Sequence, residues 1–186
     1  MPYSAGQIAT LRSMIATWLR LAIFEAMSGP EADQRLWFVI DELDALGAID
    51  GLKDALARLR KFGGRCVVGF QSIGQVSALY GRGDAQTIIE NCGNTLILRC
   101  SASEGGGTAQ FASRLIGDRE VLRNQVSHTI SRDGMTVAAR RRKSTTTSVQ
   151  HATEAAVLPA EIEQLPDLAG YLKVPSRTEW LKVRLR

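Results

Sequence analysis

The sequence has few of the residues that build disulfide frameworks and zinc sites. It contains three cysteines, Cys66, Cys92 and Cys100, and two histidines, His128 and His151. Three cysteines cannot all pair with one another, and two of them lie in apolar runs typical of strands, so a disulfide framework is not expected. No Cys-x-x-Cys spacing occurs, which argues against structural zinc. We therefore expect buried thiols in a reducing compartment.

Long hydrophobic runs and targeting signals are also lacking. No apolar stretch reaches the roughly 20 residues that cross a bilayer, and the most apolar helical segment, 15–27, is interrupted by Arg20 and Glu25. The first residues do not resemble a signal peptide. The formal net charge of +4 permits contact with nucleic acid without requiring it.

The order of elements up to residue 117 predicts an α/β fold. Continuous apolar runs at 35–42 and 66–70 indicate strands that are buried on both faces of a parallel sheet. Helical periodicity at 4–27 and 50–62 places helices before and between these strands. The remaining predicted elements are helices at 73–80, 85–92 and 108–116 and a strand at 95–99. Strands that alternate with helices in this way predict a parallel sheet flanked by helices.

After Gly117 the sequence predicts a β-rich extension over residues 118–186. Apolar pieces at 126–129, 136–139 and Val149 indicate a β-ribbon, with a hairpin turn at 132–134. A short helix opening at 158–161 and two closing strands at 170–174 and 180–185 follow. We expect this extension to complete the domain that residues 1–117 begin.

Two acids follow the first predicted strand directly. Asp41 and Glu42 come after the apolar residues 36–40, and ligands of open parallel sheets bind beyond the carboxyl ends of the strands. One carboxylate there can hold the hydration shell of Mg²⁺, and the next can orient an attacking water. A core strand that exits into solvated acids would give the same pattern.

Two further residues are placed to take part in such a site. Gln71 ends the second strand, so its amide is expected at the edge that Asp41 and Glu42 occupy, within reach of a terminal phosphate or of a loop. Arg60 lies at the C-terminal end of the helix between the strands. It can stabilise the helix dipole, or it can reach across a subunit boundary as an arginine finger.

Together these segments resemble a known family, the TraD/TraG-type coupling-protein ATPases of conjugation and type IV secretion, a branch of the RecA-like hexameric motors. The strongest matches are "LWFVIDELDALG" and "GFQS". The other matching segments are "RKFG", "QVSALYG", "NCGNTLILR", "ASRLIGDREV" and "LPAEIEQLPDLAGYLKVP", so that the resemblance covers nearly the whole chain.

The resemblance implies a RecA-like P-loop NTPase-type domain, with residues 1–117 as the C-terminal half of the nucleotide-binding unit. It also implies roles: Asp41 and Glu42 as the Walker B pair, with Asp41 holding Mg²⁺ through water, Gln71 as the γ-phosphate sensor, and Arg60 as the inter-subunit finger. The complete protein would be a homo-hexamer at the cytoplasmic face of the bacterial inner membrane. It would use ATP and Mg²⁺ to move DNA from the relaxosome into the type IV secretion channel.

The phosphate-binding half of such a site is not found in the sequence. A P-loop needs glycines followed by lysine and serine or threonine, and the only glycine cluster, "SASEGGGTAQ" at 101–110, has no lysine. We therefore expect that segment to be a turn or surface loop. Because backbone phosphate contacts dominate such sites, we expect the isolated chain neither to bind ATP tightly nor to hydrolyse it measurably.

Two alternatives to the motor remain open. The basic run Arg140, Arg141, Arg142 and Lys143, predicted as an exposed loop or strand end, is compatible with a non-catalytic DNA-binding or assembly module. The same run can also be simply solvated. The chain can also be part of another RecA-like ATPase that serves secretion or packaging.

Overall fold

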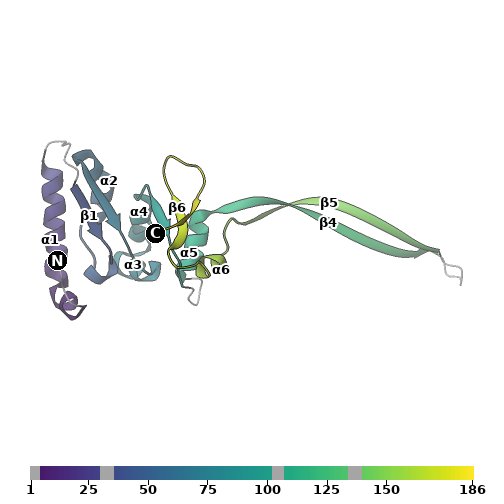
Figure 1. Ribbon diagram of the computed structural model, residues 1–186, viewed down its shortest axis with the longest axis horizontal. Coiled ribbons are helices and arrows are strands. Elements are labelled where there is room, and N and C mark those ends of the chain that lie inside the picture. Colours follow the sequence, from purple (N-terminus) through teal and green to yellow (C-terminus); the bar gives the residue numbers. More distant parts are fainter. Residues whose placement is uncertain (1–4, 30–35, 102–106, 134–139) are drawn as a thin grey trace.

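The computed structural model describes residues 5–29, 36–101, 107–133 and 140–186. The first part contains α1 (Ala5–Ser28), β1 (Leu36–Ile40), η1 (Asp44–Leu46), α2 (Leu52–Arg58), η2 (Leu59–Phe62), β2 (Gly64–Val68), α3 (Ile73–Tyr80) and α4 (Arg82–Glu90). The second part contains β3 (Thr95–Ile97), α5 (Gly107–Ile116), β4 (Asp118–Asp133), β5 (Arg140–Ala155), α6 (Pro159–Glu163), β6 (Ala169–Lys173) and β7 (Leu181–Arg184). Figure 1 shows the two parts side by side, with β4 and β5 projecting away from them.

The mixed α/β fold and the parallel pairing of the first two strands are confirmed. β1 and β2 pair in parallel, with Leu36 opposite Gly64 and Ile40 opposite Val68. The connection between them is the helical segment predicted at 50–62, which forms as α2 followed by η2. It ends at Gly63, whose φ of 77° is a left-handed conformation that glycine adopts without strain. β1 and β2 therefore end at the same edge of the sheet.

The prediction that the first strand is buried on both faces is wrong for this chain. Phe38 and Ile40 point into the core, whereas Trp37 and Val39 are 57% and 69% exposed. Val67 of β2, opposite Val39, is also exposed. The helical elements of the first part pack on the Phe38 and Ile40 side, and no described element covers the other face. We call Trp37, Val39 and Val67 the open sheet face.

The third strand also differs from expectation, because it leaves the parallel sheet. β3 pairs antiparallel with β6, and β6 pairs antiparallel with β7, which forms a separate sheet. Gly170 of β6 makes this possible, since a Cβ there would lie 2.3 Å from the backbone oxygen of Ile97. The three residues of β3 do not specify their partner, which lies more than seventy residues later in the chain. The predicted closing strands and short helix are confirmed as β6, β7 and α6.

Each of the two parts has its own hydrophobic cluster. The first gathers fully buried residues from η1, α2 and α3 and their flanks, among them Leu43, Leu52 and Val76. The second lies between α5, α6 and the antiparallel sheet, with Ile97, Ala109 and Ile162 inside. In α1, Ile23 is 3% exposed and lies in the first cluster, whereas Trp18 is 65% exposed. Among the described residues, no helix is long and apolar enough to span a membrane.

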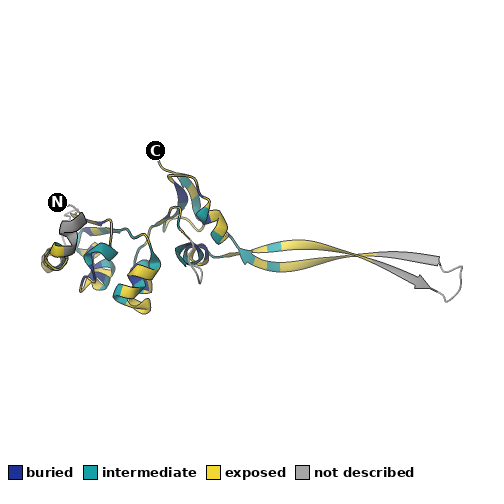
Figure 2. Ribbon diagram, turned by 90° about the horizontal axis from the view of Figure 1, so that it is seen from below, coloured by how far each residue is buried: buried dark blue, intermediate teal, exposed yellow. Residues whose placement is uncertain are grey.

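A long two-stranded ribbon, β4 with β5, extends from the second part. Each strand has 16 residues, and the antiparallel register runs from Asp118 opposite Ala155 to Asp133 opposite Arg140. The predicted β-ribbon is thus confirmed and is longer than expected, while the predicted piece at 136–139 and Gly134 of the predicted turn lie outside the described residues. Figure 2 shows the described surface of the ribbon mostly exposed.

The base of the ribbon is fixed to α5 by a buried hydrogen bond. The hydroxyl of Ser113, 4% exposed, donates to the backbone oxygen of Val157 at 2.6 Å.

Ser113→Ala should lower the free energy of unfolding by about 1–3 kcal/mol, because it leaves a buried carbonyl unpaired. Urea unfolding measures this change. Ser13→Ala, at an exposed position of α1, is the control and should stay within about 0.5 kcal/mol of the parent.

Candidate functional site

The candidate site lies where the two parallel strands end. Asp41 directly follows β1, and Gln71 lies three residues beyond the end of β2. Because the strands are parallel and in register, these residues reach the same edge of the sheet. Asp41, Glu42 and Gln71 are all exposed there. The site is therefore open to solvent on the side where ligands of parallel sheets bind.

The structure brings Glu42 and Gln71 into direct contact. The amide Nε2 of Gln71 donates a hydrogen bond to Oε1 of Glu42 at 2.7 Å. The bond joins residues that are 29 positions apart in the chain. An amide donor to a carboxylate fixes the orientation of both side chains, and it leaves the second carboxylate oxygen of Glu42 free to accept from water.

Gly69 holds the two strand ends together, and we did not predict this role from the sequence. Its N–H donates to the oxygen of Ile40 at 2.7 Å, and its own oxygen accepts from the N–H of Leu43 at 2.9 Å. A Cβ on Gly69 would lie 2.4 Å from the backbone oxygen of Asp41. The glycine within "VVGFQ" was the available signal, since glycine at a strand end often marks close approach of another backbone.

The residues after the two acids anchor the turn. Leu43 is fully buried in the first hydrophobic cluster, and Ile40 is buried there too. These two buried residues flank Asp41 and Glu42 and hold the exposed acids in place. Asp44 begins η1, and its Oδ1 is buried without a hydrogen-bond partner among the described groups. A buried carboxylate oxygen of this kind needs a donor or a cation to offset its desolvation. Asp44 was not among the residues we predicted.

The loop that carries Gln71 is tied to the second part of the chain. The N–H of Ile73 donates to the hydroxyl of Thr108 at 3.3 Å. Thr108 lies in the first turn of α5, at the end of the glycine cluster that the sequence drew attention to. Residues 102–106 of that cluster lie outside the described residues. Thr108 thus contacts the backbone of the loop that carries Gln71.

Arg60 is not brought to Glu42 and Gln71 within one chain. It is exposed in η2, immediately before β2, and therefore lies at the amino edge of the sheet. Glu42 and Gln71 lie at the carboxyl edge, and the five residues of β2 separate the two edges by roughly 13 Å. Arg60 therefore lies at the edge of the sheet opposite to Glu42 and Gln71 of the same chain.

The basic run Arg140–Lys143 forms the first four residues of β5. It pairs with residues 130–133 of β4 at the end of the ribbon that is farthest from Asp118 and Ala155. The run is therefore part of a regular strand, in agreement with the predicted strand end. It lies on a different element from the candidate site at β1 and β2 (Figure 1).

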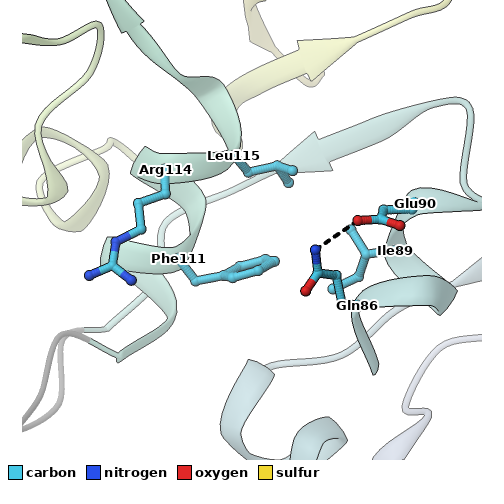
Figure 3. Close-up of a pocket in the computed structure, with 6 residues that line it drawn as sticks. All are labelled: Gln86, Ile89, Glu90, Phe111, Arg114 and Leu115. Atoms are coloured by element: carbon cyan, nitrogen blue, oxygen red, sulfur yellow. Dashed lines mark hydrogen bonds between the residues drawn. The ribbon is translucent and has the colours of Figure 1, made fainter. Parts of the chain in front are cut away.

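A shallow groove lies between α4 and α5, as Figure 3 shows. Its volume is about 250 Å³, below the roughly 300–1,000 Å³ of typical small-molecule sites. The groove is lined by Gln86, Ile89, Glu90, Phe111, Arg114 and Leu115, and none of the predicted site residues is among them. It is too small for a nucleotide and is not part of the candidate site.

The residues present fit one part of a magnesium–nucleotide site. The carboxylate of Asp41 and the Glu42–Gln71 pair supply the hard oxygen donors that magnesium takes through its hydration shell. Within the described parts of the chain, no three His, Cys, Asp or Glu side chains gather into a metal-binding cluster. These carboxylates therefore fit one side of a Mg²⁺ ion that is bound mainly by a nucleotide.

The three thiols are held in their protonated form by burial. The described cysteines are free and partly buried. Burial raises the pKa of the Cys66 thiol to about 11, with a smaller contribution from nearby Cys92. Burial also raises the pKa of the Cys92 and Cys100 thiols. Since the thiolate is the nucleophilic form, the raised pKa values favour the less reactive thiol form near neutral pH.

Comparison with known proteins identifies relatives of this chain. A family model described as the type IV secretion-system coupling protein DNA-binding domain matches residues 1–186. The coupling protein TraD of Escherichia coli (strain K12) is 28% identical over 184 residues, which are 98% of this chain and 24% of TraD.

Solved structures agree with the sequence comparison. An unbound bacterial conjugative coupling protein, TrwBdeltaN70, superposes with a TM-score of 0.81 at 31% identity, over 99% of this chain and 39% of that one. The plasmid coupling protein TrwB in complex with ADP and Mg²⁺ gives a TM-score of 0.77 at 29% identity, over 99% and 38%. The chain thus spans about a quarter of TraD and about two fifths of these structures.

Proposed function

The chain belongs to the type IV secretion-system coupling protein family, and from that premise we propose that it supplies half of the ATPase site of a DNA-translocating motor. The half in question consists of a Walker B pair, a sensor glutamine and an arginine finger. The motor would act in conjugation, as the names of its relatives indicate. The remaining half, with the phosphate loop, would come from a further segment.

The observation that carries the proposal is the hydrogen bond between Gln71 and Glu42. Its 2.7 Å length joins a sensor amide to the carboxylate that would orient water, at the carboxyl edge of two parallel strands. Motor ATPases need such a link, because the state of the terminal phosphate has to reach the residue that prepares the nucleophile. A strand that merely exits into solvent does not require it.

Each site residue would have a distinct task toward ATP and Mg²⁺. Asp41, held beside Gly69, would bind the water shell of the metal, and Glu42 would accept a hydrogen bond from the attacking water. Gln71 would hold Glu42 in place and contact the terminal phosphate. Bound Mg²⁺ would neutralise the charge of the phosphates. The chain alone offers no phosphate cradle among its described residues, so we expect weak binding of ATP by the isolated chain.

Arg60 would serve the site of a neighbouring subunit. Its place at the amino edge, about 13 Å of strand away from Gln71, supports a role in trans, since it cannot neutralise phosphates bound at its own carboxyl edge. Such an arrangement requires a ring, and a homo-hexamer is the assembly that we propose. Relaxosome, secretion channel and the cytoplasmic face of the inner membrane are the surroundings that the family implies.

The open sheet face supports completion of the domain by another segment. Trp37, Val39 and Val67 are exposed on a strand pair whose apolar run is typical of burial on both faces. Soluble proteins rarely expose such contiguous apolar surface without a partner. A segment that brings the phosphate loop would cover this face.

Mixing two inactive variants tests the proposal. With the phosphate-loop segment supplied, Glu42→Gln chains and Arg60→Ala chains should each be inactive. An equal mixture should recover about a quarter of the parent turnover, because one interface in four joins an intact Glu42 to an intact Arg60 from the next subunit. Phosphate release measures the turnover.

Two results of the mixing experiment would contradict a role of Arg60 in trans. If Arg60 acts within its own chain, no mixture contains an intact site and turnover stays at zero. If Arg60→Ala alone retains the parent rate, Arg60 is not a finger and only stabilises the helix end. Lys61→Ala, which removes the neighbouring exposed charge, is the matched control and should leave turnover unchanged.

A further inference from the structure

The ribbon carries the positive charge of the molecule. Its two strands contain seven basic and four acidic residues, an excess of three, and the whole chain has a formal net charge of +4. The rest of the chain is therefore nearly neutral. Positive charge that is concentrated on one projecting element attracts partners to that element more than to the rest of the molecule.

Within the ribbon, the charge is collected at the far end. The four register pairs that join 130–133 to 140–143 contain five basic residues and one acid, Asp133. We call these pairs the basic end. The other three acids of the ribbon, Asp118, Glu120 and Glu154, lie at its base, where Glu120 and Glu154 face His151 and Arg123. The ribbon thus changes from balanced charge at the base to strong positive charge at the tip.

In the sequence of both strands, serines and threonines follow the basic end toward the base. Residues 127–131 and 144–148 include eight serines and threonines. Those with described side chains are exposed: Ser127, Thr145, Thr146, Thr147 and Ser148. Arginine, lysine, serine and threonine are the side chains that contact the phosphate oxygens of nucleic acid.

From this distribution we infer that the basic end of the ribbon binds the phosphate backbone of duplex DNA. A two-stranded ribbon fits the major groove of B-form DNA, and strands of 16 residues extend over roughly 50 Å, more than one helical turn. The inference rests on DNA as the partner in the proposed function. It adds the surface that makes the contact and the form of DNA that fits it.

The composition of the ribbon favours duplex DNA over single-stranded nucleic acid. Residues 118–155 contain no phenylalanine, tyrosine or tryptophan. Proteins that hold single strands stack the bases on such rings. Contacts to the regularly spaced phosphates of a duplex do not need aromatic side chains.

Salt-dependent binding to a fluorescent duplex of about 30 base pairs tests the inference. The variant replaces Arg140, Arg141, Arg142 and Lys143 with glutamine in the 186-residue chain. We expect affinity at 100 mM salt to fall on the order of 10- to 100-fold, and the slope of log affinity against log salt to become shallower by about 3–4, since each phosphate contact releases about one counterion. Circular dichroism shows whether the variant keeps its fold.

A matched control removes the same charge from the body of the chain. Arg82, Arg177, Lys182 and Arg184 are exposed outside the ribbon, and their change to glutamine should lower affinity less than 3-fold and leave the slope within about 1 of the parent. If both variants weaken binding equally, the contact is only a response to net charge, and the assignment to the ribbon is overturned.

Two other probes separate the remaining outcomes. A single strand of the same length should bind more weakly than the duplex, and vesicles of phosphatidylserine and phosphatidylcholine should not bind in a way that depends on the basic end. Preference for either of these over the duplex would refute the inference. Since these assays contain no ATP, loss of ribbon binding leaves the ATPase proposal intact. A parent chain that binds no DNA at all would count against DNA translocation as well.

Discussion

Glu42→Gln should lower ATP turnover by about 100-fold or more when the phosphate-loop segment is supplied in trans. The glutamine that is introduced can still accept the hydrogen bond that Gln71 donates to Glu42 at 2.7 Å. The side-chain arrangement is therefore kept, while the negative charge that would polarise the attacking water in the proposed site is lost. Turnover should fall with little change in the KM for ATP, because in the proposed site Asp41 would still bind the water shell of the metal.

The chain offers a matched control for this substitution. Gln86 donates to Glu90 at 2.8 Å on the exposed surface of α4, which is the same kind of pair outside the candidate site. Glu90→Gln should leave turnover at the parent level. The Walker B assignment fails if Glu42→Gln keeps more than half of the parent turnover, or if the two substitutions reduce turnover equally.

Gly69→Ala should destabilise the protein by about 2 kcal/mol and lower the melting temperature by roughly 4–8 °C. The added Cβ would lie 2.4 Å from the backbone oxygen of Asp41. Because both groups belong to the backbone or are fixed to it, no change of rotamer relieves the clash. The ends of β1 and β2 must move apart, which stretches the bonds that Gly69 makes with Ile40 and Leu43.

The same substitution should disturb the site as well as the fold. Displacement of Asp41 would lower the restored ATP turnover even at temperatures where the variant is fully folded. Gly83→Ala is the control, since a Cβ there meets no atom within 4 Å and the residue lies in α4. That change should leave stability unchanged or raise it by up to about 1 kcal/mol. A Gly69→Ala variant that melts at the same temperature as the parent would contradict the close approach of Gly69 to Asp41.

The sequence was sufficient where local patterns decide the structure. The apolar runs of β1 and β2, the helix that ends at Gly63, and the acids after Ile40 all follow from short segments, and their relative placement follows from parallel pairing. The contact between Gln71 and Glu42 could be expected for that reason, because parallel strands bring their carboxyl ends to one edge.

The features that were missed depend on distant partners. β3 contains three residues, and its pairing with β6 depends on Gly170, which no local pattern in β3 reveals. Thr108 contacts the loop that carries Gln71 only because α5 packs beside α3. The exposure of Trp37 and Val39 could not be predicted from the apolar segment that contains them. Such a segment indicates that both faces of the strand are normally covered, but it does not indicate whether the same chain supplies both covering layers.

The base of the ribbon has a consequence for how the family can diversify. The ribbon starts and ends at neighbouring points, because the N–H of Ala156 donates to the oxygen of Gly117 at 2.9 Å and Asp118 pairs with Ala155. Residues between these points can be gained or lost in pairs without separating α5 from α6, and longer hairpins add little closure entropy. The reach of the ribbon can therefore evolve independently of both hydrophobic clusters and of the residues around Glu42.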